Sequence, residues 1–153
     1  MREFQYAWVN QRNRQIRITP HVERLYPGEI LVVPTNEKGI HGAGLALQAK
    51  MNFGLKQGVG EGYSGQCYAL PTKRRPHTYR SVTKIKGSVN QLIVQATNNL
   101  EITYLVPAIG TGLAKLPVPL MAEMCYPLSF LPNISLPIEF INHYVSNPEL
   151  FPH

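Results

Sequence analysis

Short apolar runs alternate with segments of helical periodicity along the middle of the chain. Residues 30–33 form a continuous run of branched apolar side chains, which is typical of a strand buried on both faces of a parallel sheet. Residues 66–70 and 102–106 form two further short strand-like runs. Because a proline directly follows each run and has no N–H to donate, we expect each strand to end there.

Three segments have the pattern of helices. Over residues 81–97 apolar side chains recur at intervals of three and four, the pattern of an amphipathic helix, and Gly87 weakens it slightly. Residues 43–53 carry apolar side chains among good helix formers, and a short helix is expected over 118–125. The alternation of strands and helices predicts an α/β sandwich whose sheet is largely parallel at its centre.

The two ends of the chain differ from this core. Residues 4–10 and 15–19 nearly alternate apolar and polar around a polar turn at 11–13, so we expect a hairpin of two outer strands. Residues 127–153 are rich in proline and are expected to form an irregular coil, in which only the last few residues fray. Four apolar or aromatic side chains are expected to hold this coil on the domain: Phe130, Leu136, Phe140 and Tyr144.

Length and composition indicate one ordinary domain. The chain has 153 residues, of which 44% are hydrophobic, so we expect a single domain over 1–153. No run approaches the roughly 20 apolar residues of a membrane helix, and the first ten residues lack the pattern of a secretory signal. We therefore expect a cytoplasmic protein with no membrane partner.

Charge, cysteines and histidines narrow the candidate chemistry. The net charge of +6 favours polyanionic partners such as a nucleic acid, a nucleotide or an acidic surface. Cys67 and Cys125 lie far apart in the sequence and are interpreted as packing residues, and no two histidines have the spacing of metal ligands on one helix face. We expect no metal and no cofactor.

The segments that follow the predicted strands are the first place to look for a ligand site. In open α/β sheets ligands bind beyond the carboxyl ends of the strands, which here lead into residues 35–44, 72–75 and 110–115. Two of these segments are rich in glycine and precede helices, an arrangement that holds phosphate oxygens, and the third brings Lys73 and two arginines. Each glycine loop alone is more often a tight turn, and neither has a dinucleotide or Walker fingerprint. Together they indicate a phosphorylated small molecule and exclude a Walker-type NTPase.

Four motifs in order resemble a macro domain. They are Ile-Leu-Val-Val-Pro-Thr-Asn at 30–36, His-Gly-Ala-Gly-Leu-Ala at 41–46 with Phe-Gly at 53–54, Tyr-Ala-Leu-Pro-Thr-Lys-Arg at 68–74 and Pro-Ala-Ile-Gly-Thr-Gly-Leu at 107–113. The resemblance covers about residues 28–116 and is strongest to the branch that contains terminal ADP-ribose protein glycohydrolase, and to related small phage and bacterial proteins. It implies a three-layer α/β/α sandwich that binds ADP-ribose, and in some members hydrolysis of ADP-ribosyl esters or of ADP-ribose 1″-phosphate.

The same resemblance implies roles for individual residues. Thr35 and Asn36 would approach the distal ribose, and Lys73 matches a lysine that attacks the anomeric carbon of that ribose in the glycohydrolase-like branch. The position of that branch's acid is Ala114, which cannot transfer a proton. The two ligand loops around the diphosphate would be formed by Gly42, Ala43 and Gly44 and by Gly110, Thr111, Gly112 and Leu113.

Other titratable residues are weighed because of Ala114. His41 adjoins the first loop and has a reference pKa of about 6.5; its alternative role is that of a loop-capping or exposed histidine. Glu37 and Glu61 are further candidates, each expected on a solvated loop. For Lys73 the alternative is a surface cation in the run at 73–75.

Three functions follow from these residues. The first is an enzyme that acts on ADP-ribosyl conjugates, with ADP-ribosylated macromolecules as partners and Lys73 or His41 as the chemical residue. The second is a module that binds or sequesters ADP-ribose or a related NAD-derived nucleotide without turning it over, as Ala114 suggests. The third is a nucleic-acid binder that uses residues 73–80, where basic and aromatic side chains are interleaved. A solvated basic loop is the preferred interpretation of that segment, because arginines are also spread over the N-terminal region.

Overall fold

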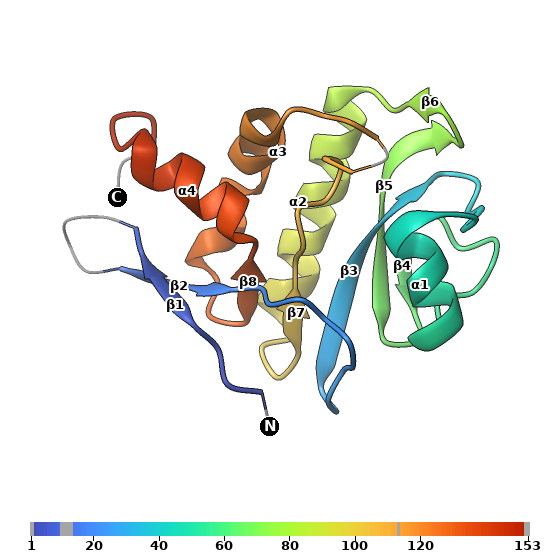
Figure 1. Cartoon of the computed structure of the whole chain (residues 1–153), viewed down its shortest axis with the longest axis horizontal. Coiled ribbons are helices and arrows are strands. Elements are labelled where there is room, and N and C mark those ends of the chain that lie inside the picture. The colour runs from blue at the N-terminus through green and yellow to red at the C-terminus, as the bar shows by residue number, and fades with distance from the viewer. Residues whose placement is uncertain (1, 10–13, 113, 152–153) are drawn as a thin grey trace.

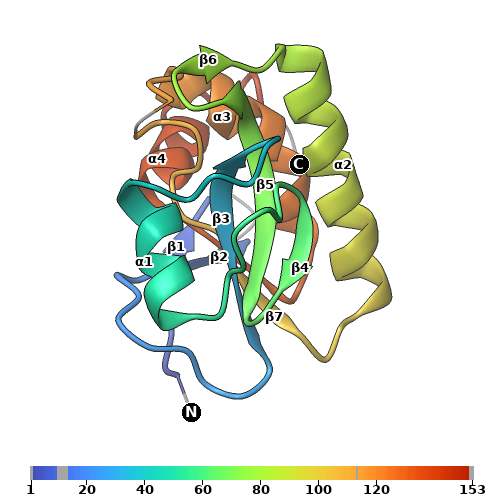
Figure 2. The ribbon, with the colours of Figure 1, turned by 90° about the vertical axis from the view of Figure 1, so that its right-hand side faces the viewer.

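The protein folds into three layers. The computed structural model describes residues 2–9, 14–112 and 114–151. Helix α1 (Gly44–Asn52) covers one face of a central sheet, and helices α2 (Val82–Asn98), α3 (Val118–Cys125) and α4 (Ile138–Ser146) cover the other (Figures 1 and 2). This arrangement confirms the expected α/β/α sandwich.

The sheet is mixed, with a parallel centre. Its order is β1-β2-β8-β7-β3-β5-β4, and β6 pairs with the far end of β5. The pairs between β2 and β5 along this order are parallel, whereas β1, β4 and β6 pair antiparallel with their neighbours. The strands are β1 (Tyr6–Trp8), β2 (Gln15–Ile18), β3 (Glu29–Asn36), β4 (Gly62–Ser64), β5 (Cys67–Arg75), β6 (Thr78–Tyr79), β7 (Thr103–Leu105) and β8 (Ile134–Leu136).

Two central strands continue past the prolines that were expected to end them. The N–H of Leu31 donates to the carbonyl of Gln66, just before β5 (2.9 Å). Because successive backbone N–H groups point to opposite sides of a strand, the nitrogen of Pro34 points toward β7. The pairing of β3 with β7 ends at Leu31, so no strand lies beside Pro34 on that side. The missing N–H of Pro34 therefore costs the sheet no hydrogen bond. Pro71 likewise lies beyond the last residue of β5 that pairs with β4. The extended strands carry Thr35, Asn36 and Lys73 to one edge of the sheet.

The helices begin and end close to the predicted residues. Ser81 caps α2, because its hydroxyl accepts a hydrogen bond from the N–H of Lys84 (3.2 Å). The buried face of α2 contains Ile85, Val89 and Leu92, which pack in the larger core between the sheet and α2, α3 and α4. A smaller core lies between α1 and the other face of β3 and β5. Over the described ranges, no helix combines the length and the apolar character needed to cross a bilayer.

The expectation of a C-terminal coil is wrong. Residues 126–130 form a 3₁₀ helix, and strand β8 and helix α4 follow it. Strand β8 inserts between β2 and β7, so only β1 of the expected outer pair forms the sheet edge. A strand of three residues close to prolines is too short to show an alternation of apolar and polar positions. Only its pairing with β2 and β7 identifies it as a strand. Leu136, Phe140 and Tyr144 are buried as expected, whereas Phe130 is 52% exposed and stacks under the guanidinium of Arg14.

The expected hairpin at the N-terminus is formed by β1 and β2, which pair antiparallel. The predicted turn at 11–13 lies outside the described residues.

Candidate ligand-binding pocket

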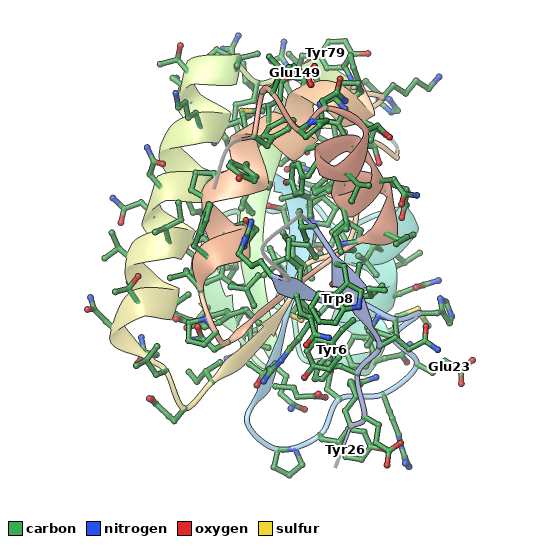
Figure 3. The ribbon with its side chains drawn as sticks, turned by 90° about the vertical axis from the view of Figure 1, so that its left-hand side faces the viewer. Tyr6, Trp8, Glu23, Tyr26, Tyr79 and Glu149 are labelled. Carbon is green, nitrogen blue, oxygen red and sulfur yellow. The ribbon has the colours of Figure 1, made fainter. Side chains whose placement is uncertain are left out.

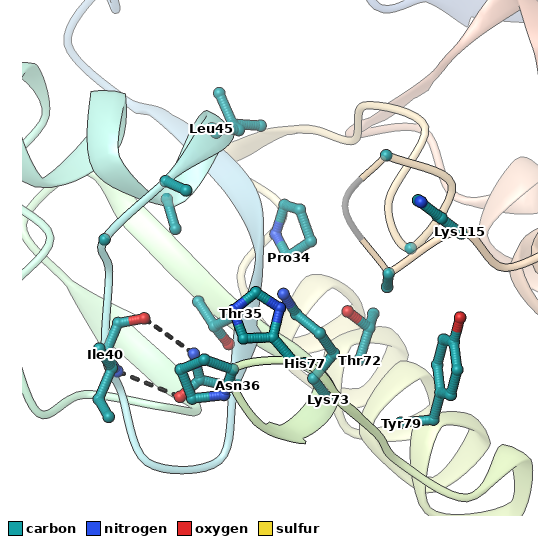
Figure 4. Close-up of a pocket in the computed structure, with 18 of the residues that line it drawn as sticks. Pro34, Thr35, Asn36, Ile40, Leu45, Thr72, Lys73, His77, Tyr79 and Lys115 are labelled. Atoms are coloured by element: carbon teal, nitrogen blue, oxygen red, sulfur yellow. Dashed lines mark hydrogen bonds between the residues drawn. The ribbon is translucent and has the colours of Figure 1, made fainter.

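A cavity of about 910 Å³ lies at the carboxyl ends of β3 and β5, within the range of about 300–1,000 Å³ usual for small-molecule sites. Its walls come from the three segments that the sequence places after the strands. Residues from the segments 34–46, 72–79 and 107–115 form the three walls. Not every residue of each segment lines the cavity. Figure 4 shows the side chains that meet there.

The turn over residues 36–40, which leads into the first ligand loop, is closed by the side chain of Asn36. Its Nδ2 donates to the carbonyl of Ile40 (2.8 Å), and its Oδ1 accepts from the N–H of Ile40 (3.1 Å; Figure 4). Gly39 takes a φ of +68° inside this turn, a conformation that favours glycine. Asn36 lines the pocket, and its side chain also holds this turn in shape.

A segment of which the sequence singled out only Gly54 supports this turn from behind. The N–H of Gly58 donates to the carbonyl of Gly39 (2.8 Å), and the hydroxyl of Thr35 donates to the carbonyl of Gly60 (2.6 Å). A Cβ on Gly60 would stand only 2.5 Å from the carbonyl oxygen of Glu37. The two backbones are in direct contact, and glycine is what allows them to approach. We call residues 54–60 the support segment.

His41 is joined to the support segment and does not line the pocket. Its side chain is fully buried, with Nε2 3.1 Å from the carbonyl oxygen of Lys56, so Nε2 is placed to donate. Nδ1 is buried without a hydrogen-bond partner among the described residues. Burial lowers the pKa of His41, and the hydrogen bond to the Lys56 carbonyl offsets part of this effect. The geometry makes His41 an anchor of the first loop.

Helix α1 begins at the pocket without a capping side chain. Ala43 is its N-cap residue, and no side chain accepts a hydrogen bond from the first turn. The first turn also contains no acidic residue. The N-terminal N–H groups of a helix have no partners within it and carry a partial positive charge. Because Gly42, Ala43, Gly44 and the next two residues line the cavity, these groups are placed to hold an anion there.

The second ligand loop places glycines in the opposite wall. Gly110 has a φ of +79°, and a Cβ there would crowd Leu116 and Met121 at 3.2 Å. Gly112 also lines the cavity, and a Cβ there would meet nothing within 4 Å. Thr111 does not line the cavity, because its hydroxyl turns back to donate to the carbonyl of Ala108 (2.7 Å). Leu113 lies outside the described residues.

The third wall brings cationic and aromatic side chains to the pocket. Lys73 lines it from β5 and lies beside Asn36 in the register of β3 with β5. His77 and Tyr79 line it from the turn and strand that follow, and Lys115 lines it from the second ligand loop (Figure 4). The sequence assigned His77 and Tyr79 only to the nucleic-acid alternative and did not single out Lys115. Among the described residues that line the cavity, none carries a carboxylate.

The two glutamates considered as candidates are bound elsewhere. Arg80 is nearly buried, and its Nε donates to Glu37 at 2.7 Å. That hydrogen bond is the largest cause that lowers the pKa of Glu37. A second nitrogen of Arg80 donates to the hydroxyl of Ser88 (2.7 Å), which donates in turn to Glu61 (2.8 Å). Neither glutamate lines the cavity, and Arg80 belongs to this network instead of to an exposed basic patch.

Burial keeps both cysteine thiols protonated. Cys67 and Cys125 are buried and form no disulfide, and burial raises the pKa of the first thiol to about 11 and of the second to about 12. Within the described ranges, no three His, Cys, Asp or Glu side chains gather as metal ligands would.

Comparison with known proteins supports the fold. No family model matches this sequence, and no curated protein matches it. Among solved structures, a chain of Thermosipho africanus DarTG, determined in complex with ADP-ribose, superposes with a TM-score of 0.51 at 23% identity. The match covers 73% of this chain and 38% of the DarTG chain, so this chain matches well under half of that protein's length. At this identity the likeness shows the fold alone, an α/β/α sandwich whose sheet is parallel at its centre.

Proposed function

We propose that this protein binds ADP-ribose or a closely related NAD-derived nucleotide in the pocket between the two glycine loops. One observation carries the proposal: the uncapped start of α1 and the second ligand loop face the same cavity, to which Lys73 and Lys115 add positive charge and no described residue adds a carboxylate. Such a lining favours a diphosphate. The DarTG structure of similar fold contains ADP-ribose, which supports this ligand.

In the proposed complex the diphosphate lies between the start of α1 and the second ligand loop. The distal ribose then lies near Thr35, Asn36 and Lys73, at the carboxyl ends of β3 and β5. A cavity of about 910 Å³ has room for a whole dinucleotide-sized ligand. The AMP part and the ribose 5-phosphate part of ADP-ribose would therefore both contribute to the binding free energy. The whole nucleotide should bind more tightly than either fragment alone.

Calorimetric titration with ADP-ribose tests the proposal, with AMP and ribose 5-phosphate as fragment controls. We expect ADP-ribose to bind well above both fragments. Gly112→Glu should weaken binding by about tenfold or more, because it adds a negative charge in the wall of the proposed diphosphate site, and tenfold corresponds to only about 1.4 kcal/mol. Neither Gly112 nor Gly87 has packing for a side chain to disturb, so Gly87→Glu on the exposed face of α2 is a matched control.

No binding of ADP-ribose at millimolar concentration would contradict the proposal. Equal weakening by Gly112→Glu and Gly87→Glu would place the ligand outside this pocket.

A second candidate function is hydrolysis of an ADP-ribosyl conjugate or of ADP-ribose 1″-phosphate. It is favoured by the place of Lys73 beside Asn36 in the wall of the cavity. For a conjugate, the Lys73 amine would form a bond to the anomeric carbon as the bond to the leaving group breaks, and the leaving group takes up a proton. Water would then break the new carbon–nitrogen bond, which releases ADP-ribose and restores the amine. Ala114 lines the cavity where the resembling branch has an acid, and no described lining residue has a carboxylate to supply that proton. Binding without turnover is therefore the preferred form of the proposal.

Incubation with an ester-linked ADP-ribosyl peptide and with ADP-ribose 1″-phosphate distinguishes the two forms. The binding function predicts that both compounds are recovered unchanged. Turnover that is lost in Lys73→Ala, while ADP-ribose binding persists, would instead show a hydrolase that uses this lysine. Turnover that persists in Lys73→Ala would remove the lysine from the chemistry.

A further inference from the structure

The outer edge of β1 offers unpaired backbone groups. The N–H of Val9 donates to the carbonyl of Arg14 (2.9 Å), and the N–H of Ile18 donates to the carbonyl of Gln5 (2.8 Å). In an antiparallel pair the bonded residues alternate with residues whose N–H and C=O groups point away. The backbone groups of Tyr6 and Trp8 therefore point away from β2. Within the described part of the chain, β1 pairs with no other strand (Figure 1).

The side chains of the same two residues stand on an uncovered face of the sheet. Ala7 and Val9 turn toward the larger core, so Tyr6 and Trp8 turn to the opposite face. There Tyr6 is 49% exposed and Trp8 is 57% exposed. Figure 3 shows both rings on the outside of the β1–β2 ribbon, with no helix over them.

Apart from its short length of three residues, this edge lacks the features that commonly prevent strand pairing. Natural edge strands are blunted by lysine or other charges, by proline, or by a bulge that twists the edge away. Residues 5–9 read Gln-Tyr-Ala-Trp-Val and contain no charged residue and no proline. The β1–β2 register continues without a bulge over the whole of β1. An uncharged edge does not repel an identical edge, as a lysine-bearing edge would.

We propose that β1 is the interface of a homodimer, in which the β1 strands of two copies pair antiparallel about a two-fold axis at Ala7. In this register Tyr6 of each copy is opposite Trp8 of the other. The outward N–H and C=O groups of these residues then form four hydrogen bonds, because each bonded pair exchanges two. Both aromatic pairs lie on the same open face, where directly opposed aromatic side chains stabilise a sheet.

The register makes the surface complementary to itself, which a two-fold dimer requires. It also leaves the ligand pocket free, because β1 and the strands that carry the pocket lie well apart in the sheet order. The strand is short, so the interface belongs to the small class below about 1,200 Å². We therefore expect a dissociation constant of the order of 10 µM.

Sedimentation velocity and the fluorescence of Trp8 test the association. From about 1 to about 200 µM protein, a range that brackets this dissociation constant, the mass should rise from 17.2 kDa toward twice that value. Trp8 is the sole tryptophan, so its emission should shift to shorter wavelength over the same range. Trp8→Lys should remain at the monomer mass at the highest concentration, while its circular dichroism and ADP-ribose binding match the wild type. A wild-type protein that stays at 17.2 kDa throughout would overturn the proposal, as would undiminished association of Trp8→Lys.

Disulfide trapping tests the register. Opposed residues of a non-bonded antiparallel pair have Cα atoms about 4.5 Å apart, within the range a disulfide spans. Ala7→Cys should therefore form a covalent dimer under mild oxidation. In the same register two copies of residue 5 are offset by four residues, about 13 Å, so Gln5→Cys is the matched control and should stay monomeric. The native cysteines are buried and do not compete. Equal trapping of both variants would overturn this register.

Discussion

Replacing Gly60 with alanine tests how the support segment shapes the pocket. A Cβ at this position would stand 2.5 Å from the carbonyl oxygen of Glu37 and 2.7 Å from that of Asn36. Such contacts below 3.0 Å essentially do not occur, so the backbones must separate by about half an ångström or more. No flexible side chain is available to move instead, because both atoms belong to the main chain at the end of β3.

The expected cost follows from two opposing effects. Overpacking of a closely packed site costs about 1–3 kcal/mol, whereas replacing glycine with alanine in a compatible conformation recovers about 0.4–1 kcal/mol through the unfolded chain. The φ of Gly60 is outside the left-handed region, so no conformational strain is added. We expect a net loss of about 1–2 kcal/mol, which lowers the Tm of a domain of this size by about 2–8 °C. ADP-ribose affinity should also fall, because Asn36, whose backbone would be displaced, lines the pocket.

Thermal melts with and without ADP-ribose measure both effects. Gly42→Ala is the matched control, because Gly42 also lies in the site and outside the left-handed region but has nothing within 4 Å of its would-be Cβ. Its Tm should equal or slightly exceed that of the wild type. A Gly60→Ala protein that melts within about a degree of the wild type, and so shows under about 0.5 kcal/mol of change, would refute the close contact of the two backbones.

Three further predictions concern buried polar and thiol groups. Because burial lowers the pKa of His41, the unfolded chain binds its proton more readily, so stability should be full above about pH 6.5 and decline as pH falls below it. The decline of Tm from pH 7.5 to pH 5 should be smaller in His41→Gln than in the wild type or in the exposed control His21→Gln; equal declines would contradict this. Arg80→Lys should cost about 1–3 kcal/mol in urea unfolding, since one ammonium cannot replace the forked donors of the guanidinium, and an unchanged midpoint would count against this role for the network. An aromatic disulfide reagent should modify neither Cys67 nor Cys125 in the native protein and both after denaturation, because burial raises the pKa of both thiols; rapid native labelling would show that one of them is accessible.

The central fold could be predicted because its elements carry strong local patterns. The helix over Val82–Asn98 presents apolar residues at helical intervals over 17 residues, and β3 contains a continuous apolar run. The lengths of β3 and β5 could not be predicted from their prolines. Whether a missing N–H matters depends on which neighbouring strand lies on that side, and this is a property of the whole sheet. Strand β8 shows the same limit, because its three residues are specified by the gap between β2 and β7.

The candidate site was predictable at the level of segments and less so at the level of side chains. Glycine loops after parallel strands must meet at one edge of the sheet, and the structure brings both loops and Lys73 to one cavity. His41 is next to the first loop in sequence, but its side chain points to the support segment, which no local pattern relates to it. Gly39 and Gly60 are the signal that was available. Glycines that recur in two nearby segments indicate that two backbones approach each other.

The composition of the pocket also bears on how binding and catalysis would separate. In the proposed complex the uncapped start of α1, the second ligand loop and Lys115 act on the diphosphate, whose charge does not change when a bond at the distal ribose breaks. Interactions that are equal in the ground state and the transition state tighten binding without raising the rate of the chemical step. Lys73 lines the cavity from β5 and lies next to Asn36. In the proposed complex it is therefore the charged side chain nearest to the distal ribose. Titration of Lys73→Ala should therefore show only a modest loss of ADP-ribose affinity, within about tenfold, whereas Gly112→Glu should show the larger loss. The opposite order would place the diphosphate at Lys73 and reverse the orientation of the ligand.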